Sequence, residues 1–345
     1  ACRHEHTQRN DQNRESLHLV NAFPSGKICQ RVCASYVAAS SSAVTSMPDH
    51  ASPPSVSYRP ALAWFAALGS VWVFVLVTLG AFTTSIGAGM AFPDWPLSNG
   101  SINPHGWLTN LAMFDEHSHR LSGMTMGLIT IGLVVWLWRT EPRGWLRALS
   151  WWALAIVIFQ GVLGGTRVLF DPVHVPGFEM TLGQMLRIPH GVLAQIYVCV
   201  LIAIAVALSR SWIEGTTSQV GCTVRRAGAI CCALLLVQLV VAAVMRHNNA
   251  GLAIPTFPRS TAQGDWLPAV WSFPVAIQFA HRVMALILAV AIIWFAIRIR
   301  LDRGASLGLR LGSSVLVTLV AVQIILGAHT VLSLRNPEVT TGHVV

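Results

Sequence analysis

Charged side chains are scarce in this chain. They account for only 11% of its 345 residues, whereas an average soluble domain is about a quarter charged. Hydrophobic residues account for 54% instead. This composition excludes an ordinary soluble domain, and we expect lipid to be the main solvent of the folded chain.

The positive charge that is present is not arranged like a nucleic-acid-binding surface. The formal net charge is +9, but the arginines lie in short clusters between apolar runs. That distribution is typical of membrane topology signals. We therefore expect no nucleic-acid partner.

The cysteines lack any recognisable pattern. Seven occur, at positions 2, 29, 33, 199, 222, 231 and 232, and their spacing matches neither a disulfide framework nor a zinc site. The sequence therefore predicts neither a covalent cross-link nor a structural zinc ion.

Residues 1–57 lack an apolar run and are polar and rich in serine. We predict that this segment is disordered. Because Met47 opens a short tail ahead of the first apolar run, residues 1–46 are expected to be either non-native upstream translation or a targeting segment. The acids Glu5, Asp11 and Glu15 argue against an organelle presequence.

Apolar runs long enough to span a bilayer begin after residue 60. A span needs about 20 mostly apolar residues. Seven segments qualify, at 61–81, 118–138, 149–166, 190–208, 227–245, 275–297 and 312–332. An eighth begins near Thr341 and is cut off by the end of the chain. We predict an all-α integral membrane protein whose eighth helix is truncated.

The segments between spans alternate in charge. Arginines follow the second, fourth and sixth spans, at Arg139, Arg143, Arg147, Arg210, Arg225, Arg226, Arg298, Arg300, Arg303 and Arg310. The 83–113 loop contains neither Lys nor Arg. Because positive loops stay on the inner side of a membrane, this pattern predicts an N-terminus that is inside.

An internal repeat runs through the spans. Its matched segments are Ala88–Pro96 with Ala250–Pro258, His119-Arg120 with His281-Arg282, Gln160–Gly165 with Gln323–Ala328, and His190 with His343. The first two matches share an offset of 162 residues, and the third has an offset of 163. The last match requires a loop about ten residues shorter in the second copy. An even number of spans separates the copies, so we predict two parallel four-helix bundles, 58–220 and 221–345.

Four repeat-related histidines are suited to hold haem iron. His119, His190, His281 and His343 each lie near the outer end of an even-numbered span. Neutral imidazole is a common metal ligand, and two on facing helices can bind one iron at about 2.0–2.1 Å. A single histidine could instead hydrogen-bond a backbone carbonyl, but four matched ones favour two bis-histidine haem sites. We pair His119 with His190 and His281 with His343.

Two arginines follow these histidines directly. Arg120 and Arg282 would lie at the outer interface, where a guanidinium can bind a haem propionate through a bidentate fork. They could equally extend to lipid headgroups. Both interpretations remain open on the sequence.

The two copies differ three residues before the first histidine of each. Glu116 stands there in the first copy and Gln278 in the second. Three residues are close to one helical turn, so Glu116 lies on the face of His119 and can move protons there. This predicts a chemically active first copy and an electron relay in the second. Alternatively, Glu116 caps the start of its helix.

These residues together resemble the haem A synthases of bacterial and mitochondrial membranes. The resemblance extends from about residue 61 to the C-terminus. Its carriers are the Ala88–Pro96 loop, the Glu116-x-x-His119-Arg120 motif, Gln160–Gly165 and the histidines that start spans four, six and eight. It implies oxidation of the C8 methyl of haem O to the formyl group of haem A, with oxygen derived from water.

The resemblance also implies roles for individual residues. His119 and His190 would bracket the substrate haem O in 58–220, with Glu116 assisting the chemistry. His281 and His343 would ligate a permanent haem b in 221–345, and electrons would pass through it to a membrane acceptor. One branch of the family has a cysteine pair in the first outer loop, whereas the 83–113 loop has none. Because the chain ends at Val345, span eight is almost absent.

Other functions remain open on the residues alone. A diheme b-type electron-transfer cytochrome would need the same histidines, but it leaves the difference between Glu116 and Gln278 without a purpose. A transporter could contain the same repeat, but its polar residues would lie near the midplane. The family resemblance favours the haem O synthase, a membrane electron acceptor and a second copy of the chain as partners. It places the protein in the bacterial cytoplasmic membrane or, alternatively, the mitochondrial inner membrane, with haem sites toward the outer face.

Overall fold

The structure is a computed structural model that describes residues 56–177, 179–215 and 218–345. The expectation of disorder for residues 1–57 concerns residues outside this description, apart from Val56 and Ser57. The same holds for the interpretation of residues 1–46 as non-native or targeting sequence.

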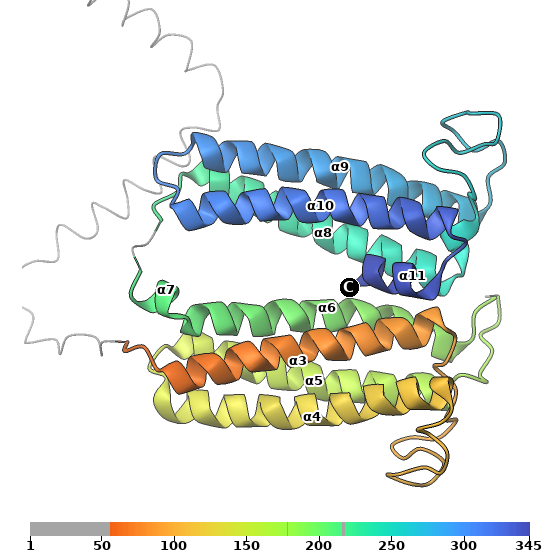
Figure 1. Ribbon diagram of the computed structural model, residues 1–345, viewed down its shortest axis with the longest axis horizontal. Helices are drawn as coiled ribbons and strands as arrows, with labels where there is room; N and C mark the ends of the chain where they lie inside the picture. The colour runs from red at the N-terminus through yellow and green to blue at the C-terminus, as the bar shows by residue number, and fades with distance from the viewer. Residues whose placement is uncertain (1–55, 178, 216–217) are drawn as a thin grey trace, which may run out of the picture. The chain divides into compact units, whose positions relative to one another are not determined.

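Seven of the described helices are long and apolar enough to cross a membrane (Figure 1). They are α3 (Pro60–Ser85), α4 (Leu111–Thr140), α5 (Gly144–Leu169), α6 (Leu182–Leu208), α8 (Cys222–His247), α9 (Phe273–Leu301) and α10 (Leu307–Leu332). Each contains one of the seven predicted spans. No strand occurs in the described part of the chain, so the protein is an all-α integral membrane protein, as predicted.

Short elements connect or follow the long helices. They are α7 (Arg210–Ile213), the 3₁₀ turn η1 (Ala250–Leu252) and α11 (Pro337–Val344). The Asn336 side chain caps α11 by accepting hydrogen bonds from the backbone N–H groups of Glu338 and Val339. The predicted eighth span therefore begins as a helix, four residues earlier than its apolar run near Thr341.

Local chemistry determines where the helices begin. Pro60 starts α3, where its fixed φ suits the first turn and its missing N–H is not needed. The side chain of Asn110 accepts from Met113 N–H at the start of α4, and Thr181 forms a capping box with Gln184 at the start of α6. α4 begins seven residues before its predicted span, because its polar first turns are buried under a loop instead of lying in water.

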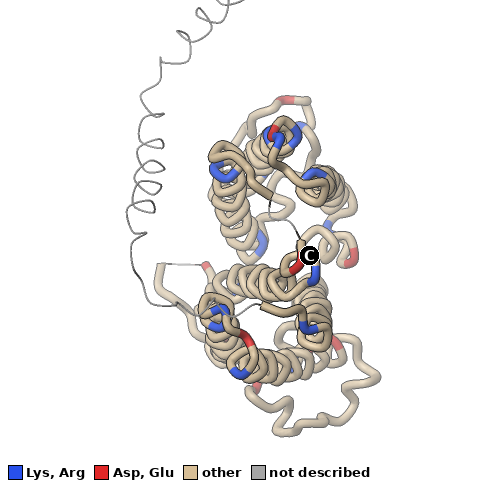
Figure 2. The backbone as a smooth tube through the Cα atoms, turned by 90° about the vertical axis from the view of Figure 1, so that its left-hand side faces the viewer, with Lys and Arg blue, Asp and Glu red and all other residues tan. Residues whose placement is uncertain are grey.

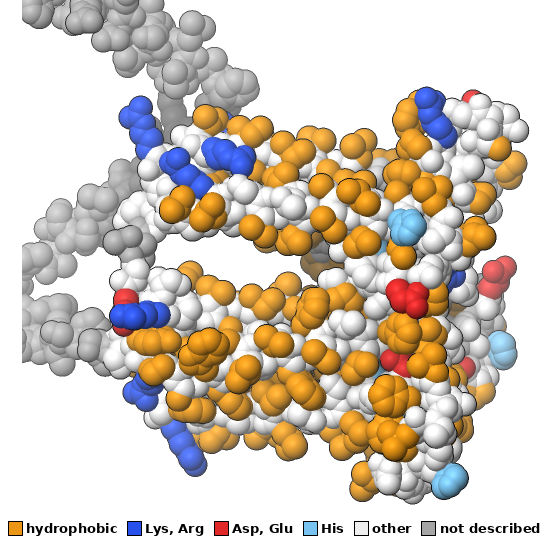
Figure 3. Space-filling view, in the orientation of Figure 1, with side chains coloured by type: hydrophobic (Ala, Val, Ile, Leu, Met, Phe, Trp, Pro, Cys, Tyr) orange, Lys and Arg blue, Asp and Glu red, His pale blue; other side chains and the backbone are white. Residues whose placement is uncertain are grey.

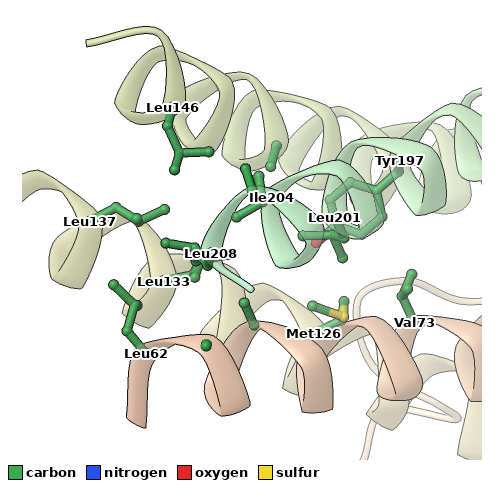
Figure 4. Packing of buried hydrophobic residues seen from close by; sticks show 14 residues of the cluster. Leu62, Val73, Met126, Leu133, Leu137, Leu146, Tyr197, Leu201, Ile204 and Leu208 are labelled. Carbon is green, nitrogen blue, oxygen red and sulfur yellow. The ribbon is translucent and has the colours of Figure 1, made fainter. Parts of the chain in front are cut away.

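The helices pack in two groups that correspond to the repeat. In the first, α3 contacts α4 and α6, and α5 contacts α4 and α6. Its apolar core includes Leu62, Met126, Tyr197 and Ile204 (Figure 4). In the second, α9 contacts α8 and α10, and α10 contacts α11. Contacts of α6 with α8 and of α11 with α3 join the groups.

Charge separates the two ends of the bundle. Hydrophobic side chains cover the long sides of the helices, as expected for a lipid-facing surface (Figure 3). Arginines gather at the end where α4, α6 and α9 finish (Figure 2). The loops 86–110, 170–181 and 253–272 lie at the opposite end (Figure 1). We refer to that opposite end as the outer end.

Candidate functional site

The four predicted histidine ligands all lie near the outer end. His119, His190 and His281 each follow the first residue of α4, α6 and α9 by eight positions. His343 lies in α11, which starts at the same end (Figure 1). At 1.5 Å per residue, the first three stand about 12 Å into their helices. The four histidines are therefore at similar depth.

His281 and His343 face each other. Their ring centroids are 6.2 Å apart and their planes are nearly perpendicular, at 88°. Two imidazoles that share one metal ion at about 2.0–2.1 Å place their ring centres about 6 Å apart. The pair therefore has the separation that a bis-histidine haem iron requires, although α10 lies between α9 and α11 in the sequence.

His119 and His190 are brought near one another by α4 and α6. The two imidazoles lie within electrostatic range of each other, and both are within range of the guanidinium of Arg167. Each ring rests on a glycine of a neighbouring helix: His119 on Gly80 of α3 and His190 on Gly164 of α5. The predicted pairing therefore has a geometric counterpart in the first helix group.

The glycines make room for the imidazole rings. A Cβ added at Gly164 would lie 3.3 Å from Cε1 of His190, and one added at the repeat-related Gly327 would lie 2.9 Å from Cε1 of His343. Both glycines lie in segments that the repeat matches, Gln160–Gly165 and Gln323–Ala328. The described structure assigns two of their glycines specifically to the histidines of α6 and α11.

Replacing Gly80 with alanine should displace His119. The added Cβ would lie 2.7 Å from Cε1 of the imidazole, closer than real Cβ contacts permit, so the ring must move. We expect a cost of about 1–3 kcal/mol and weaker haem binding in the first helix group, measured as haem occupancy of the purified protein. Gly127→Ala is the control, because a Cβ there meets nothing within 4 Å. Equal occupancy in both variants would contradict the contact.

Hydrogen bonds orient two of the rings. Nδ1 of His119 lies 3.2 Å from the carbonyl oxygen of Leu76. A carbonyl only accepts, so Nδ1 carries the proton and Nε2 keeps the lone pair that a metal needs. At the repeat-related position in α8, the side-chain amide of Gln238 lies 3.0 Å from Nδ1 of His281. Residues 76 and 238 thus support the first histidine of each pair, one through its backbone and the other through its side chain.

Glu116 and Gln278 hold the outer loops onto their helices. Glu116 is only 1% exposed, and its Oε2 accepts a hydrogen bond of 3.2 Å from the backbone N–H of Phe92. Gln278 is 2% exposed, and its Oε1 accepts from the N–H of Ile254, which is the repeat-related residue. The two side chains therefore share a structural role, whatever chemistry Glu116 adds. Both are buried, whereas a residue that only caps a helix start is usually exposed.

Arg120 and Arg282 bind the same loops. Arg120 donates to the carbonyl oxygens of Asp94, Leu97 and Phe92 and forms an ion pair of 2.6 Å with Glu116. Arg282 donates to the carbonyl oxygens of Ile254 and Thr256. Backbone carbonyl oxygens therefore already accept hydrogen bonds from both guanidinium groups. The expected contacts of Arg120 and Arg282 with haem propionates stay a prediction.

The first outer loop has further attachments. The carboxylate of Asp94 accepts from the N–H groups of Asn99 and Gly100, at 2.7 Å each. Partial burial acts to raise the pKa of Asp94, but these hydrogen bonds and the charge of Arg120 outweigh it and keep that pKa below its usual range. The indole of Trp95 packs directly against Gly165 of α5. The loop is thereby held over the end of the first helix group.

The remaining histidines differ in their surroundings. His105, His174 and His329 are exposed. His117 is buried, and its Nδ1 lies 3.0 Å from Oγ of Ser98 in the first outer loop. His247 ends α8 and lies close to Gly191 of α6. Among the histidines that the structure describes, His117 and His247 are therefore two further ones that lie beside structures around the candidate site.

Sequence reasoning missed several residues that the structure brings to this site. They are Gly80, Gln238, Arg167, Arg187 and Arg246. Leu76 and Gln238 occupy repeat-related positions but carry different side chains. The repeat alone therefore did not reveal that each contacts the first histidine of its pair. Arg167, Arg187 and Arg246 have no arginine at the repeat-related positions, and this difference between the copies was the sequence feature that could have identified them.

The chain is similar to known proteins over most of its spans. Residues 108–345 match the COX15-CtaA family, described as cytochrome oxidase assembly protein. A protein of Halalkalibacterium halodurans named "Heme A synthase" is 28% identical over 242 residues, covering 67% of this chain and 74% of the relative. One of Bacillus licheniformis with the same name is 30% identical, covering 65% and 70%. One of Rhizorhabdus wittichii, also so named, is 26% identical, covering 85% and 92%.

Proposed function

The chain belongs to the COX15-CtaA family, that of the haem A synthases, and from this premise we propose that it converts haem O to haem A. The relatives' shared name and the paired histidines support this proposal. The single observation in this chain itself that supports a haem function is the facing arrangement of the His281 and His343 rings, whose centroids are 6.2 Å apart.

The proposed reaction oxidises a methyl group to a formyl group. The C8 methyl of haem O and one water molecule together give the formyl group, four electrons and four protons, of which two come from the methyl group and two from the water. A haem b held by His281 and His343 in the second helix group would supply the one-electron redox chemistry that carries these electrons toward a membrane acceptor. The protons require groups near the outer end that can accept them.

Two pairs of imidazoles would hold the two haems. His119 and His190 would ligate haem O, and their support by Gly80, Gly164 and the Leu76 carbonyl favours this assignment. His281 and His343 would ligate haem b. Haem iron bound in this way supplies one-electron redox chemistry, and the protein's part is to position the porphyrin and exclude water.

Glu116 is the proposed proton acceptor. It lies one helical turn from His119 and is enclosed beneath the first outer loop. A carboxylate has about four lone-pair sites, so the bonds from Phe92 N–H and Arg120 leave capacity for a water molecule or a proton. Gln278 cannot take this role, which fits an electron-relay function of the second group.

The orientation in the membrane is also a proposal. Arginines at the end where α4, α6 and α9 finish favour that end as the inner side. The histidine pairs would then face the outer side of a bacterial cytoplasmic membrane or of the mitochondrial inner membrane. The haem O synthase and a second copy of the chain are proposed partners on the basis of the family.

The haem products decide between synthase and electron-transfer cytochrome. The full chain is expressed together with a source of haem O, and the extracted haems are separated by chromatography and identified by mass. We expect haem A and its hydroxylated intermediate. A chain that retains haem b but never yields either product would be a diheme cytochrome, and the synthase proposal would be wrong.

A further inference from the structure

A cluster of cationic side chains lies beside the first histidine pair. Its members are Arg167 of α5, Arg187 of α6, and Arg246 with His247 of α8. All four are partly or mostly buried. They come from the outer ends of helices in both groups, at the junction where α6 contacts α8 (Figure 1). We call these four residues the basic cluster.

The members of the basic cluster are close to one another. His247 is within electrostatic range of Arg246, Arg187 and Arg167, and Arg167 is within range of Arg187. The cluster also reaches the candidate site, because Arg167 is within range of His119 and His190. A Cβ added at Gly191, the residue after His190, would lie 4.0 Å from Nε2 of His247.

Acidic partners balance only part of this charge: Glu116 and Asp171 are the two acids within electrostatic range of Arg167. Arg187 forms an ion pair of 2.6 Å with Asp171. Arg246 donates to the carbonyl of Ala81 and to Oγ of Ser85, and Arg167 donates to the carbonyl of Gly89. Two guanidinium nitrogens, Nη1 of Arg246 and Nε of Arg187, are buried and have no hydrogen-bond partner among the described residues.

The basic cluster occurs in only one copy of the repeat. At the offsets that align the copies, Arg167 corresponds to Thr330, Arg187 to Thr340, Arg246 to Thr84 and His247 to Ser85. The matching positions at the junction of α3 with α11 carry hydroxyl side chains, and both Thr341 and Arg246 donate to Ser85 there. Packing of the repeat does not require the cations, since hydroxyl side chains occupy the matching positions.

Partly buried cations whose charge is not fully balanced are costly in a membrane protein and usually mark a ligand site. Guanidinium groups bind carboxylates through parallel N–H···O bonds. We propose that the basic cluster binds the carboxylate groups of the porphyrin that His119 and His190 hold, with Arg246 and Arg187 supplying the free N–H donors. This inference rests on the proposed function, because it assumes a porphyrin in the first helix group.

The asymmetry of the cluster would give the two haem sites different tasks. A porphyrin in the first group would meet Arg167 and His247 beside its histidines, whereas Arg246 is the member of the basic cluster within electrostatic range of His343. Electrostatic attraction would draw a dianionic substrate toward His119 and His190 and place it in one orientation. A substrate that must be recognised and exchanged benefits from such steering more than a permanent haem does.

Esterified porphyrin provides a direct test. The full chain, purified with its resident haem, is titrated with ferric protoporphyrin IX and, separately, with its dimethyl ester, and binding is followed by the Soret band. We expect the wild-type chain to bind the free acid at least about tenfold more tightly than the ester, because each charge-assisted hydrogen bond is worth about that factor. Arg246→Gln should reduce this ratio about tenfold.

The ratio is internal to each variant, so a partly folded preparation does not change it. Arg187→Gln should reduce the ratio similarly, and Arg246→Lys should reduce it less because the charge remains. Arg259→Gln is the control, because that exposed arginine donates within its own loop to Gly264. It should leave the ratio unchanged.

The outcomes separate this inference from the proposed function. A wild-type chain that binds neither porphyrin would argue against the proposed function itself. Equal binding of acid and ester by the wild type would overturn the carboxylate site alone, as would be found if a phospholipid headgroup fills the basic cluster. An unchanged ratio in both Arg246→Gln and Arg187→Gln would overturn it as well.

Discussion

Replacing His281 with alanine should remove the resident haem from the purified chain. His281 and His343 face each other at the separation of two ligands on one iron, so losing one imidazole leaves a pentacoordinate or empty site. We expect haem b content to fall by more than about tenfold and haem A production to stop, since electrons then have no relay. Pyridine haemochrome spectra of the purified protein measure the content.

His119→Ala provides the comparison for that experiment. This variant lacks a ligand of the first pair only, so it should keep the resident haem while haem A production stops. The exposed His329 serves as a control for histidine removal, and His329→Ala should keep both haem and product. If His119→Ala lost the resident haem and His281→Ala retained it, the assignment of the two pairs would be reversed.

Replacing Glu116 with glutamine should abolish haem A production without disturbing the fold. The second repeat copy already contains this substitution: Gln278 accepts the N–H of Ile254 as Glu116 accepts that of Phe92. A glutamine at position 116 can therefore hold the first outer loop. It cannot accept a proton, so we expect product formation to fall about a hundredfold or more, while both haems stay bound.

The measurements for Glu116→Gln are haem content and haem products of the same preparation. The matched control is Gln278→Glu, which places a carboxylate at the repeat-related position and should leave product formation unchanged if the second group only relays electrons. Normal haem A yield from Glu116→Gln would remove Glu116 from the chemistry and leave it as a loop contact. Loss of bound haem in that variant would instead indicate that its ion pair with Arg120 is structural.

Hydropathy predicted the membrane helices because lipid imposes a minimum length on every span. All seven predicted spans lie within observed helices. The start of α4 was predicted less well, since Asp115, Glu116 and His117 look like interfacial residues in the sequence but are buried in the structure. Polar residues face water only where no loop covers them. Here the 86–110 loop folds back over these residues and supplies hydrogen bonds to Glu116 and His117.

The repeat predicted the histidine pairs but not their supports. Repetition reveals residues that match, and the four histidines match. It conceals contacts made through backbone atoms, such as the Leu76 carbonyl, and contacts made by the absence of a side chain, such as Gly80 against His119. Arg120 and Arg282 matched as well, yet their guanidinium groups bind loop carbonyls whose positions depend on the folded loop.

The sequence by itself determined the membrane solvent, the approximate positions of seven spans, the repeat, the matched histidines and the family, because each follows from local composition or from spacing along the chain. Only the tertiary structure decided which polar groups meet. Arg246 reaches the carbonyl of Ala81 across 165 positions, and the basic cluster forms because the ends of α5, α6 and α8 converge. Hydrogen bonds and charges act over a few ångströms, so their partners depend on helix packing and not on distance along the sequence.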